Sequence, residues 1–176
     1  MREREVKVLN IDKDEIERKL KEIGAVLLKD EEQTNIRFDT EDNFLKETYN
    51  GYLRIRTTNN LLNGKSKNTL TFKKSLSRDK MRINEETETE ISNFDETIKI
   101  LEFLGYNKKR PGYKHRRSYE YENIIFEIDT WDKDTYPKPY LEIEISSEEE
   151  LEKAIELLQL DREQITTKSI DELKKD

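Results

Sequence analysis

Apolar and polar residues alternate over several short stretches of the chain, as they do in strands that have one apolar face and one polar face. The alternation is clearest at residues 53–56 (Leu-Arg-Ile-Arg) and 140–145 (Tyr-Leu-Glu-Ile-Glu-Ile). This pattern predicts about eight strands. The nine candidate segments are residues 3–7, 25–28, 35–39, 51–57, 69–74, 86–90, 113–121, 124–131 and 140–145.

Three other segments carry apolar residues at helical spacing and have helix start or stop signals. One helix is expected to follow Asp12 and to end at Gly24. A second is expected from near Asn93 to Gly105. A third opens at Ser147, in a sequence that resembles a capping box.

The remaining segments are mostly polar. We expect a short final helix within residues 169–175 and a polar connection at residues 41–50. Residues 75–83 carry Arg78 and Arg82 and are interpreted as a mobile basic loop.

About eight strands and three helices leave two architectures open, because so few helices cover only part of the apolar strand faces. In an open sheet, the apolar faces pack on helices and the charged faces lie in bulk water. In a closed barrel, the charged faces turn into the lumen and the apolar faces lie outside, against the helices. Alternation alone does not decide between them, although closure removes exposed sheet edges.

The composition adds an unusually high charge to this picture. Of the 176 residues, 41% are charged, 32% are hydrophobic, and the formal net charge is −7. The length suits one domain over residues 1–176, and the negative charge gives no general reason to expect a nucleic-acid partner. Cysteine is absent, which excludes disulfides and thiolate metal sites, and no apolar run approaches a membrane span. We therefore expect a cytoplasmic protein with no membrane partner.

Charges of both signs collect on the polar faces of the predicted strands. The acids are Glu3, Glu5, Glu86, Glu88, Glu90, Glu127, Asp129, Glu142 and Glu144, and the bases are Lys7, Arg37, Arg54, Arg56, Lys73, Lys114 and Arg116. A closed lumen would desolvate these charges, so they would need partners there. A polyanion held by Arg and Lys, with Mg²⁺ or Mn²⁺ bridging it to the carboxylates, would supply them.

Other catalytic chemistries lack their residues. His115 is the single histidine, which rules out His-metal clusters and Cys-His nucleophiles, and the five glycines are too scattered for a phosphate-binding glycine loop. Phosphoryl transfer needs only charge neutralisation, alignment and an oriented nucleophile. The charged strand faces are therefore compatible with that chemistry.

The stretch Glu3-x-Glu5-x-Lys7 resembles the ExExK signature of the CYTH superfamily, the triphosphate tunnel metalloenzymes. That family includes class IV adenylate cyclases, thiamine triphosphatases and inorganic triphosphatases. Supporting matches follow in the family's order at residues 53–56, 70–73, 86–90, 114–116, 140–144 and 168–169. The resemblance implies an α+β fold, a closed eight-stranded antiparallel β-barrel (the triphosphate tunnel) with helices packed outside, in a single CYTH domain over residues 1–176.

The resemblance also implies roles for the charged residues. Metal would be held by Glu3, Glu5, Glu142 and Glu144, with help from Glu88 or Asp129, and phosphates by Arg37, Arg54, Arg56, Lys73, Lys114 and Arg116. Lys7 would contact the triphosphate or position the attacking water, so we assign catalytic roles to Lys7 and Glu5. The implied cofactor is Mg²⁺ or Mn²⁺.

The function implied by the resemblance is metal-dependent hydrolysis of a small triphosphate: tripolyphosphate, thiamine triphosphate or a nucleoside triphosphate such as ATP. Residues 35–39 (Asn-Ile-Arg-Phe-Asp) are partly similar to a segment of the class IV cyclases, which form cyclic AMP and pyrophosphate from ATP. Cyclase activity is therefore one alternative. A non-catalytic module that binds polyphosphate or a nucleotide is another, and a homodimer is left open.

Overall fold

The computed structural model describes residues 2–175, in which ten strands, five α-helices and a short 3-10 helix are present. The strands are β1 (Arg2–Val8), β2 (Val26–Asp39), β3 (Gly51–Asn60), β4 (Ser66–Arg78), β5 (Arg82–Glu90), β6 (Asn107–Lys108), β7 (Gly112–Tyr121), β8 (Ile124–Trp131), β9 (Tyr140–Glu144) and β10 (Ile165–Thr166). The helices are α1 (Lys13–Glu22), α2 (Phe44–Tyr49), α3 (Phe94–Phe103), α4 (Glu148–Leu158), the 3-10 helix η1 (Arg162–Gln164) and α5 (Ile170–Leu173).

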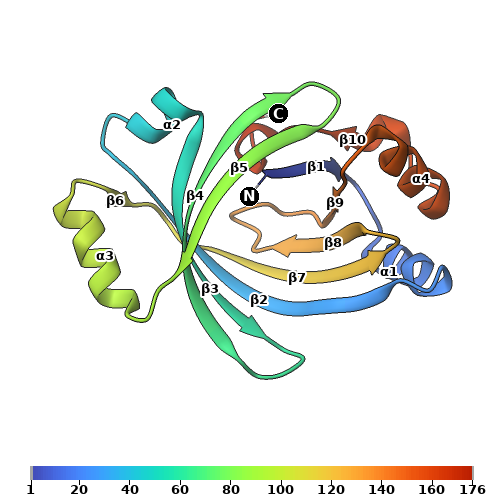
Figure 1. The fold of residues 1–176 in the computed structure, drawn as a ribbon, viewed down its shortest axis with the longest axis horizontal. Helices are drawn as coiled ribbons and strands as arrows, with labels where there is room; N and C mark the ends of the chain where they lie inside the picture. Colours follow the sequence, from blue (N-terminus) through green and yellow to red (C-terminus); the bar gives the residue numbers. More distant parts are fainter. Residues whose placement is uncertain (1, 176) are drawn as a thin grey trace.

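Eight of the strands close into an antiparallel barrel in the order β1-β5-β4-β3-β2-β7-β8-β9 (Figure 1). The first and last strands of this order pair with each other, with Val6 opposite Ile143. The short strands β10 and β6 pair outside the ring, with β1 and β2 respectively. The α+β closed barrel is thus confirmed, and the open-sheet alternative is wrong for this chain.

The apolar strand faces lie on the outside of the barrel, where two groups of helices cover them. Leu20 of α1 and Leu158 of α4 pack with β1, β8 and β9 residues such as Ile143 in the larger core. On the other side, Leu101 of α3 packs with Phe38 in a smaller core. Figure 1 shows these helix groups at opposite ends of the barrel. This arrangement leaves the charged faces of the strands turned inward.

The predicted helix caps are present. Asp12 accepts hydrogen bonds from the backbone N–H groups of Asp14 and Glu15, and Asn93 and Ser147 each accept one from the residue three positions later. The α1 and α3 helices are followed by Gly24 and Gly105, whose φ angles of 83° and 86° favour glycine.

Three local predictions were wrong. Residues 26–39 form one long strand rather than two short ones, because β2 pairs with β3 on one side and β7 on the other, through residues that are polar on both faces. Residues 41–50 contain the helix α2, in which the backbone N–H groups of Leu45 and Lys46 donate to the carboxylate of Asp39 on the preceding strand.

The third error concerns residues 75–83, which were expected to be a mobile loop. The strand β4 continues to Arg78 and β5 begins at Arg82, so only residues 79–81 connect them. Arg82 is buried inside the barrel, where it donates to Asn84 Oδ1 at 3.0 Å. Among the residues that the structure describes, no helix is long and apolar enough to span a bilayer.

Candidate functional site

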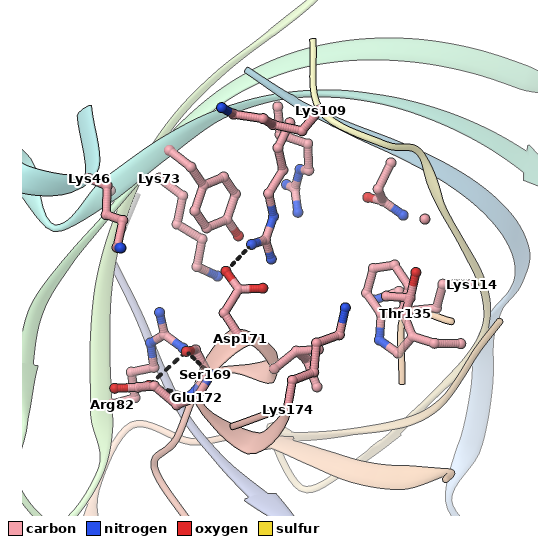
Figure 2. A pocket seen from close by; sticks show the side chains of 18 of the residues that line it. Lys46, Lys73, Arg82, Lys109, Lys114, Thr135, Ser169, Asp171, Glu172 and Lys174 are labelled. Atoms are coloured by element: carbon pink, nitrogen blue, oxygen red, sulfur yellow. Dashed lines mark hydrogen bonds and ion pairs between the residues drawn. The ribbon is translucent and has the colours of Figure 1, made fainter. Parts of the chain in front are cut away.

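The interior of the barrel, which we call the bore, contains a cavity of about 860 Å³. Side chains from all eight barrel strands line it, as do residues 169–175 near the C-terminus. Figure 2 looks into this cavity, with Lys46, Lys73, Lys109 and Lys114 around it and Asp171 in its centre. The lining is therefore rich in cations, although the whole chain is acidic.

Strand register brings carboxylates together on one wall of the bore. Glu127 on β8 lies opposite Glu142 on β9, and Glu144 on β9 lies opposite Glu5 on β1. Residues opposite each other in an antiparallel pair have Cβ atoms about 4.5–5.5 Å apart. Like charges in such positions repel, so this wall favours a cation beside it.

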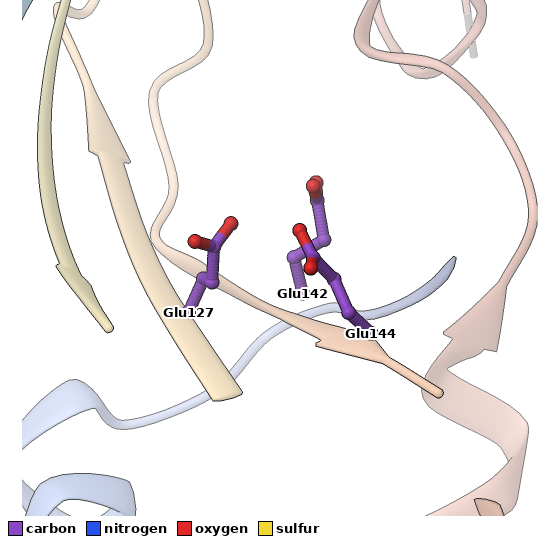
Figure 3. A group of neighbouring side chains, drawn as sticks. All are labelled: Glu127, Glu142 and Glu144. Carbon is purple, nitrogen blue, oxygen red and sulfur yellow. The ribbon is translucent and has the colours of Figure 1, made fainter. Parts of the chain in front are cut away.

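Glu127, Glu142 and Glu144 form an acidic cluster on this wall. One carboxylate oxygen from each lies within 4.8 Å of the others, and Figure 3 shows the three side chains extending into the same space. Burial, and then the charges of Glu127, Glu3 and Glu142, raise the pKa of Glu144 to about 8. Hard divalent ions prefer carboxylate oxygens, so the donor set fits Mg²⁺ or Mn²⁺.

Lys7 lies beside the acidic cluster. Its Nζ is 3.2 Å from Glu142 Oε2 and 3.4 Å from Glu5 Oε1. Burial by itself lowers the pKa of Lys7, but the carboxylates of Glu142 and Glu5 outweigh burial and leave that pKa raised. Lys7 is therefore a fixed cation at the edge of the cluster.

Across the barrel from β8 and β9, the strands β3 and β4 carry a basic wall. Lys73 Nζ is 2.7 Å from Glu86 Oε1 and 2.9 Å from Glu3 Oε2. Arg56 Nε donates to the neutral Asn35 Oδ1 at 2.9 Å. Burial, followed by the charges of Arg54 and Arg116, lowers the pKa of Arg56 to about 10. An anion in the bore would relieve this crowding of cations.

Arg116 and Lys114 on β7 share one carboxylate. Arg116 donates from Nε and Nη2 to the two oxygens of Asp129, each at 2.6 Å, and also forms an ion pair with Glu127. Lys114 Nζ donates to Asp129 Oδ2 at 3.0 Å. Burial and the nearby Arg116 lower the pKa of Lys114 to about 7. Asp129 is thus neutralised within the fold.

The cavity lining contains most of the residues that the sequence assigned to a site. They are Glu3, Glu5, Lys7, Arg37, Arg54, Arg56, Lys73, Lys114, Arg116, Glu142 and Glu144. Glu88 and Asp129 lie elsewhere: Glu88 is exposed and accepts a hydrogen bond from Thr71 Oγ1 at 2.7 Å, and Asp129 is fully buried beneath its two cations. Metal binding by these two acids stays a prediction that this arrangement does not favour.

Sequence reasoning missed four features of the site. Glu127, rather than Asp129, joins the acidic cluster, although both share the inward parity of β8. Arg82 was placed in a loop, and its Nε lies 3.9 Å from Glu5 Oε1. Tyr52 was also missed, and its ring centre lies 4.4 Å from the Arg37 guanidinium. Its position two residues before Arg54, on the same face of the strand, could have indicated that it points inward. The sequence match at residues 168–169 did not indicate that the segment after it would line the cavity.

The fold and site together define a class of protein: a closed antiparallel barrel whose bore has a basic wall across from an acidic cluster. The family model for the CYTH domain matches residues 1–175, and the chain belongs to that family. No match is found among the curated proteins.

Solved structures with the same fold include PH1012 from Pyrococcus horikoshii, which is 24% identical with a TM-score of 0.77 over 97% of this chain and 98% of that one. A candidate adenylate cyclase from Vibrio parahaemolyticus is 16% identical with a TM-score of 0.77, covering 99% and 98% of the two chains. HpAC1 from Hippeastrum, a candidate adenylyl cyclase with a dominant triphosphatase activity, is 17% identical with a TM-score of 0.67, covering 95% and 91%.

Proposed function

We propose that this protein is a divalent-metal-dependent enzyme that hydrolyses inorganic tripolyphosphate or a nucleoside or thiamine triphosphate. The observation that carries the proposal is the division of the bore into a basic wall and an acidic cluster. A polyanion satisfies the first, and a hard cation satisfies the second. The dominant triphosphatase activity of the structurally similar HpAC1 is consistent with this choice.

In this proposal, the basic wall binds and aligns the phosphate chain. Arg54 and Arg56 would offer planar guanidinium donors to phosphate oxygens, and Lys73 would add a compact charge. Glu127, Glu142 and Glu144 would hold the metal. A bound divalent ion would neutralise charge on the transferred phosphoryl group and on the leaving group.

Glu5 and Lys7 would orient the attacking water. Glu5 Oε2 is buried, accepts no hydrogen bond from any described residue and lies 3.7 Å from Lys73 Nζ, so it is available to accept a proton from water. The water oxygen would form the new bond to the terminal phosphorus, and the bond from that phosphorus to the bridging oxygen would break. Pyrophosphate is the leaving group when the substrate is tripolyphosphate. Lys7, fixed between Glu5 and Glu142, would orient the phosphoryl group.

Adenylate cyclase activity is the second candidate function. The cavity of about 860 Å³ is lined by Tyr52, Trp131 and Tyr140 as well as by charges, which leaves aromatic surface for a nucleoside beyond the triphosphate. A binding module without turnover is less well supported, because a polyanion clamp has no need for three crowded carboxylates.

The test is incubation with tripolyphosphate, ATP or thiamine triphosphate, each with Mg²⁺, Mn²⁺ or a chelator. Orthophosphate release that depends on metal is the expected result, whereas cyclic AMP with pyrophosphate would identify a cyclase. Glu142→Gln should abolish turnover, and Arg54→Ala should mainly raise KM. Glu152→Gln, which changes an exposed ion pair with Arg162, is the matched control. Binding without product from any of these substrates would reduce the protein to a binding module.

A further inference from the structure

The C-terminal segment of residues 169–175 forms part of the cavity wall. Its helix α5 is held there by the buried side chain of Ile170 and by a capping box between Ser169 and Glu172. In Figure 2, Asp171 and Glu172 point toward the cationic side chains of the bore. Two acidic residues therefore sit at a cavity whose remaining lining contains more basic than acidic residues.

Each of these carboxylates forms an ion pair with a cavity-lining arginine. Asp171 Oδ2 lies 2.5 Å from Nη1 of Arg37, and Glu172 Oε1 is paired with Nη1 of Arg78. Arg37 comes from β2 and Arg78 from the end of β4, so the two pairs connect α5 to two different strands of the barrel.

These pairs use the same donors that a phosphate chain would need. A guanidinium binds carboxylate and phosphate oxygens with similar planar geometry, so one ligand excludes the other from the same N–H groups. Arg37 has a second contact that does not compete: its guanidinium lies 4.4 Å from the centre of the Tyr52 ring. Arg37 can therefore keep its place on Tyr52 when Asp171 leaves.

We propose that α5 is an autoinhibitory latch, in which Asp171 and Glu172 occupy Arg37 and Arg78 until a polyphosphate chain displaces them. This inference rests on the proposed function, because it takes the polyanion as the natural occupant of the bore. Binding of the chain releases α5 from both arginines, and departure of the product lets α5 close again.

The latch is weak enough to open. The side chains of Asp171 and Arg37 are 61% and 35% exposed, and those of Glu172 and Arg78 are 39% and 31% exposed. Ion pairs this exposed contribute little stability each, so removing one carboxylate should tighten polyphosphate binding by about threefold, and removing both by about tenfold. A multiply charged chain that reaches both arginines compensates for the loss of both pairs.

The experiment uses the full chain, a chelator and inorganic tripolyphosphate as the probe. Trp131 is the single tryptophan and lines the cavity, so its fluorescence reports binding. The variants are Asp171→Asn, Glu172→Gln and the double substitution, with Glu152→Gln as the control for loss of a surface carboxylate. Glu172→Gln keeps the helix cap, since glutamine also completes a capping box. Because the chain has no cysteine, Lys175→Cys gives a unique site for a dye whose anisotropy reports release of α5.

We expect tripolyphosphate to bind more tightly to the latch variants than to the wild type, and to bind Glu152→Gln with unchanged affinity. In the wild-type background, the dye anisotropy should fall with added tripolyphosphate until it saturates. In the double variant the anisotropy should be low before any ligand is added. Equal affinities with constant anisotropy would overturn the latch and leave the proposed function standing. Absence of tripolyphosphate binding in the wild type and in every variant would also overturn the latch, whereas the proposed function is tested separately by metal-dependent release of orthophosphate.

Discussion

At the scale of single residues, strand register decides which buried charges are neutralised by the fold. Asp129 and Glu127 are two residues apart on the inward face of β8. Asp129 lies opposite Arg116 and receives two of its N–H donors, whereas Glu127 lies between Ser118 and Glu142 in register. Asp129 is therefore neutralised by two cations, whereas Glu127 has only a share of Arg116 and lies in a cluster of three carboxylates.

Glu144 should make the metal-free protein less stable in alkali. Its folded pKa of about 8 exceeds the ordinary value of 4.5, so the folded state retains a proton that the unfolded state has lost. Its contribution to stability therefore falls as the pH rises from about 4.5 through about 8. Glu144→Gln should melt close to the wild type at about pH 5 and clearly higher at about pH 9, in chelator. A difference in melting temperature between Glu144→Gln and the wild type that stays constant with pH would contradict this prediction. So would the same pH-dependent difference in Glu152→Gln.

The sequence predicts which residues enter the bore but not which of them meet. Parity placed Glu3, Glu5 and Lys7 together, and each does line the cavity. It did not reveal that Glu127 faces Glu142, because that depends on the register between two strands joined by a loop of eight residues. A register shift of one residue would reverse every inward side chain.

At the scale of elements, helices with clear caps were predicted better than segments whose structure depends on tertiary partners. Asp12 and Ser147 fix helix starts through contacts within three residues. The continuity of β2 depends on two neighbouring strands, and α2 depends on Asp39, which lies before the helix on β2. Local sequence carries little information about such distant partners.

The helix α4 should stabilise the barrel mainly through its buried face. Leu158 is fully buried in the core that also contains Leu20 and Ile143. Leu158→Ala should therefore lower the free energy of unfolding by about 2–5 kcal/mol, because it leaves a cavity that the core fills only in part. Ile100→Ala on α3 is the control, since Ile100 is 57% exposed. Similar urea midpoints for the two variants would show that α4 is not an essential part of the core.

At the scale of the whole molecule, barrel closure turns a charged sheet face into a site. Alternation alone was equally compatible with an open sheet, and the choice of a barrel came from the resemblance to a family. The physical reason for closure is the pairing of β1 with β9, which joins residues 135 positions apart and brings Lys7 opposite Glu142. Without that pairing, the acidic cluster and the basic wall would not enclose a common space.

Because the strands enclose the charged bore, we predict that a polyanion bound there stabilises the entire fold. The bore holds arginines with too few anionic partners, such as Arg56, whose pKa is lowered to about 10 by burial and by Arg54 and Arg116. Tripolyphosphate at a hundred times its dissociation constant should add about 2.7 kcal/mol to the free energy of unfolding. For a domain of this size, that corresponds to a rise in Tm of about 5–10 °C. Sodium sulfate at equal ionic strength is the control, and Arg54→Ala should reduce the rise. If sulfate raised the Tm of the wild type and of Arg54→Ala as much as tripolyphosphate does, the effect would be general screening of charge rather than occupation of the bore.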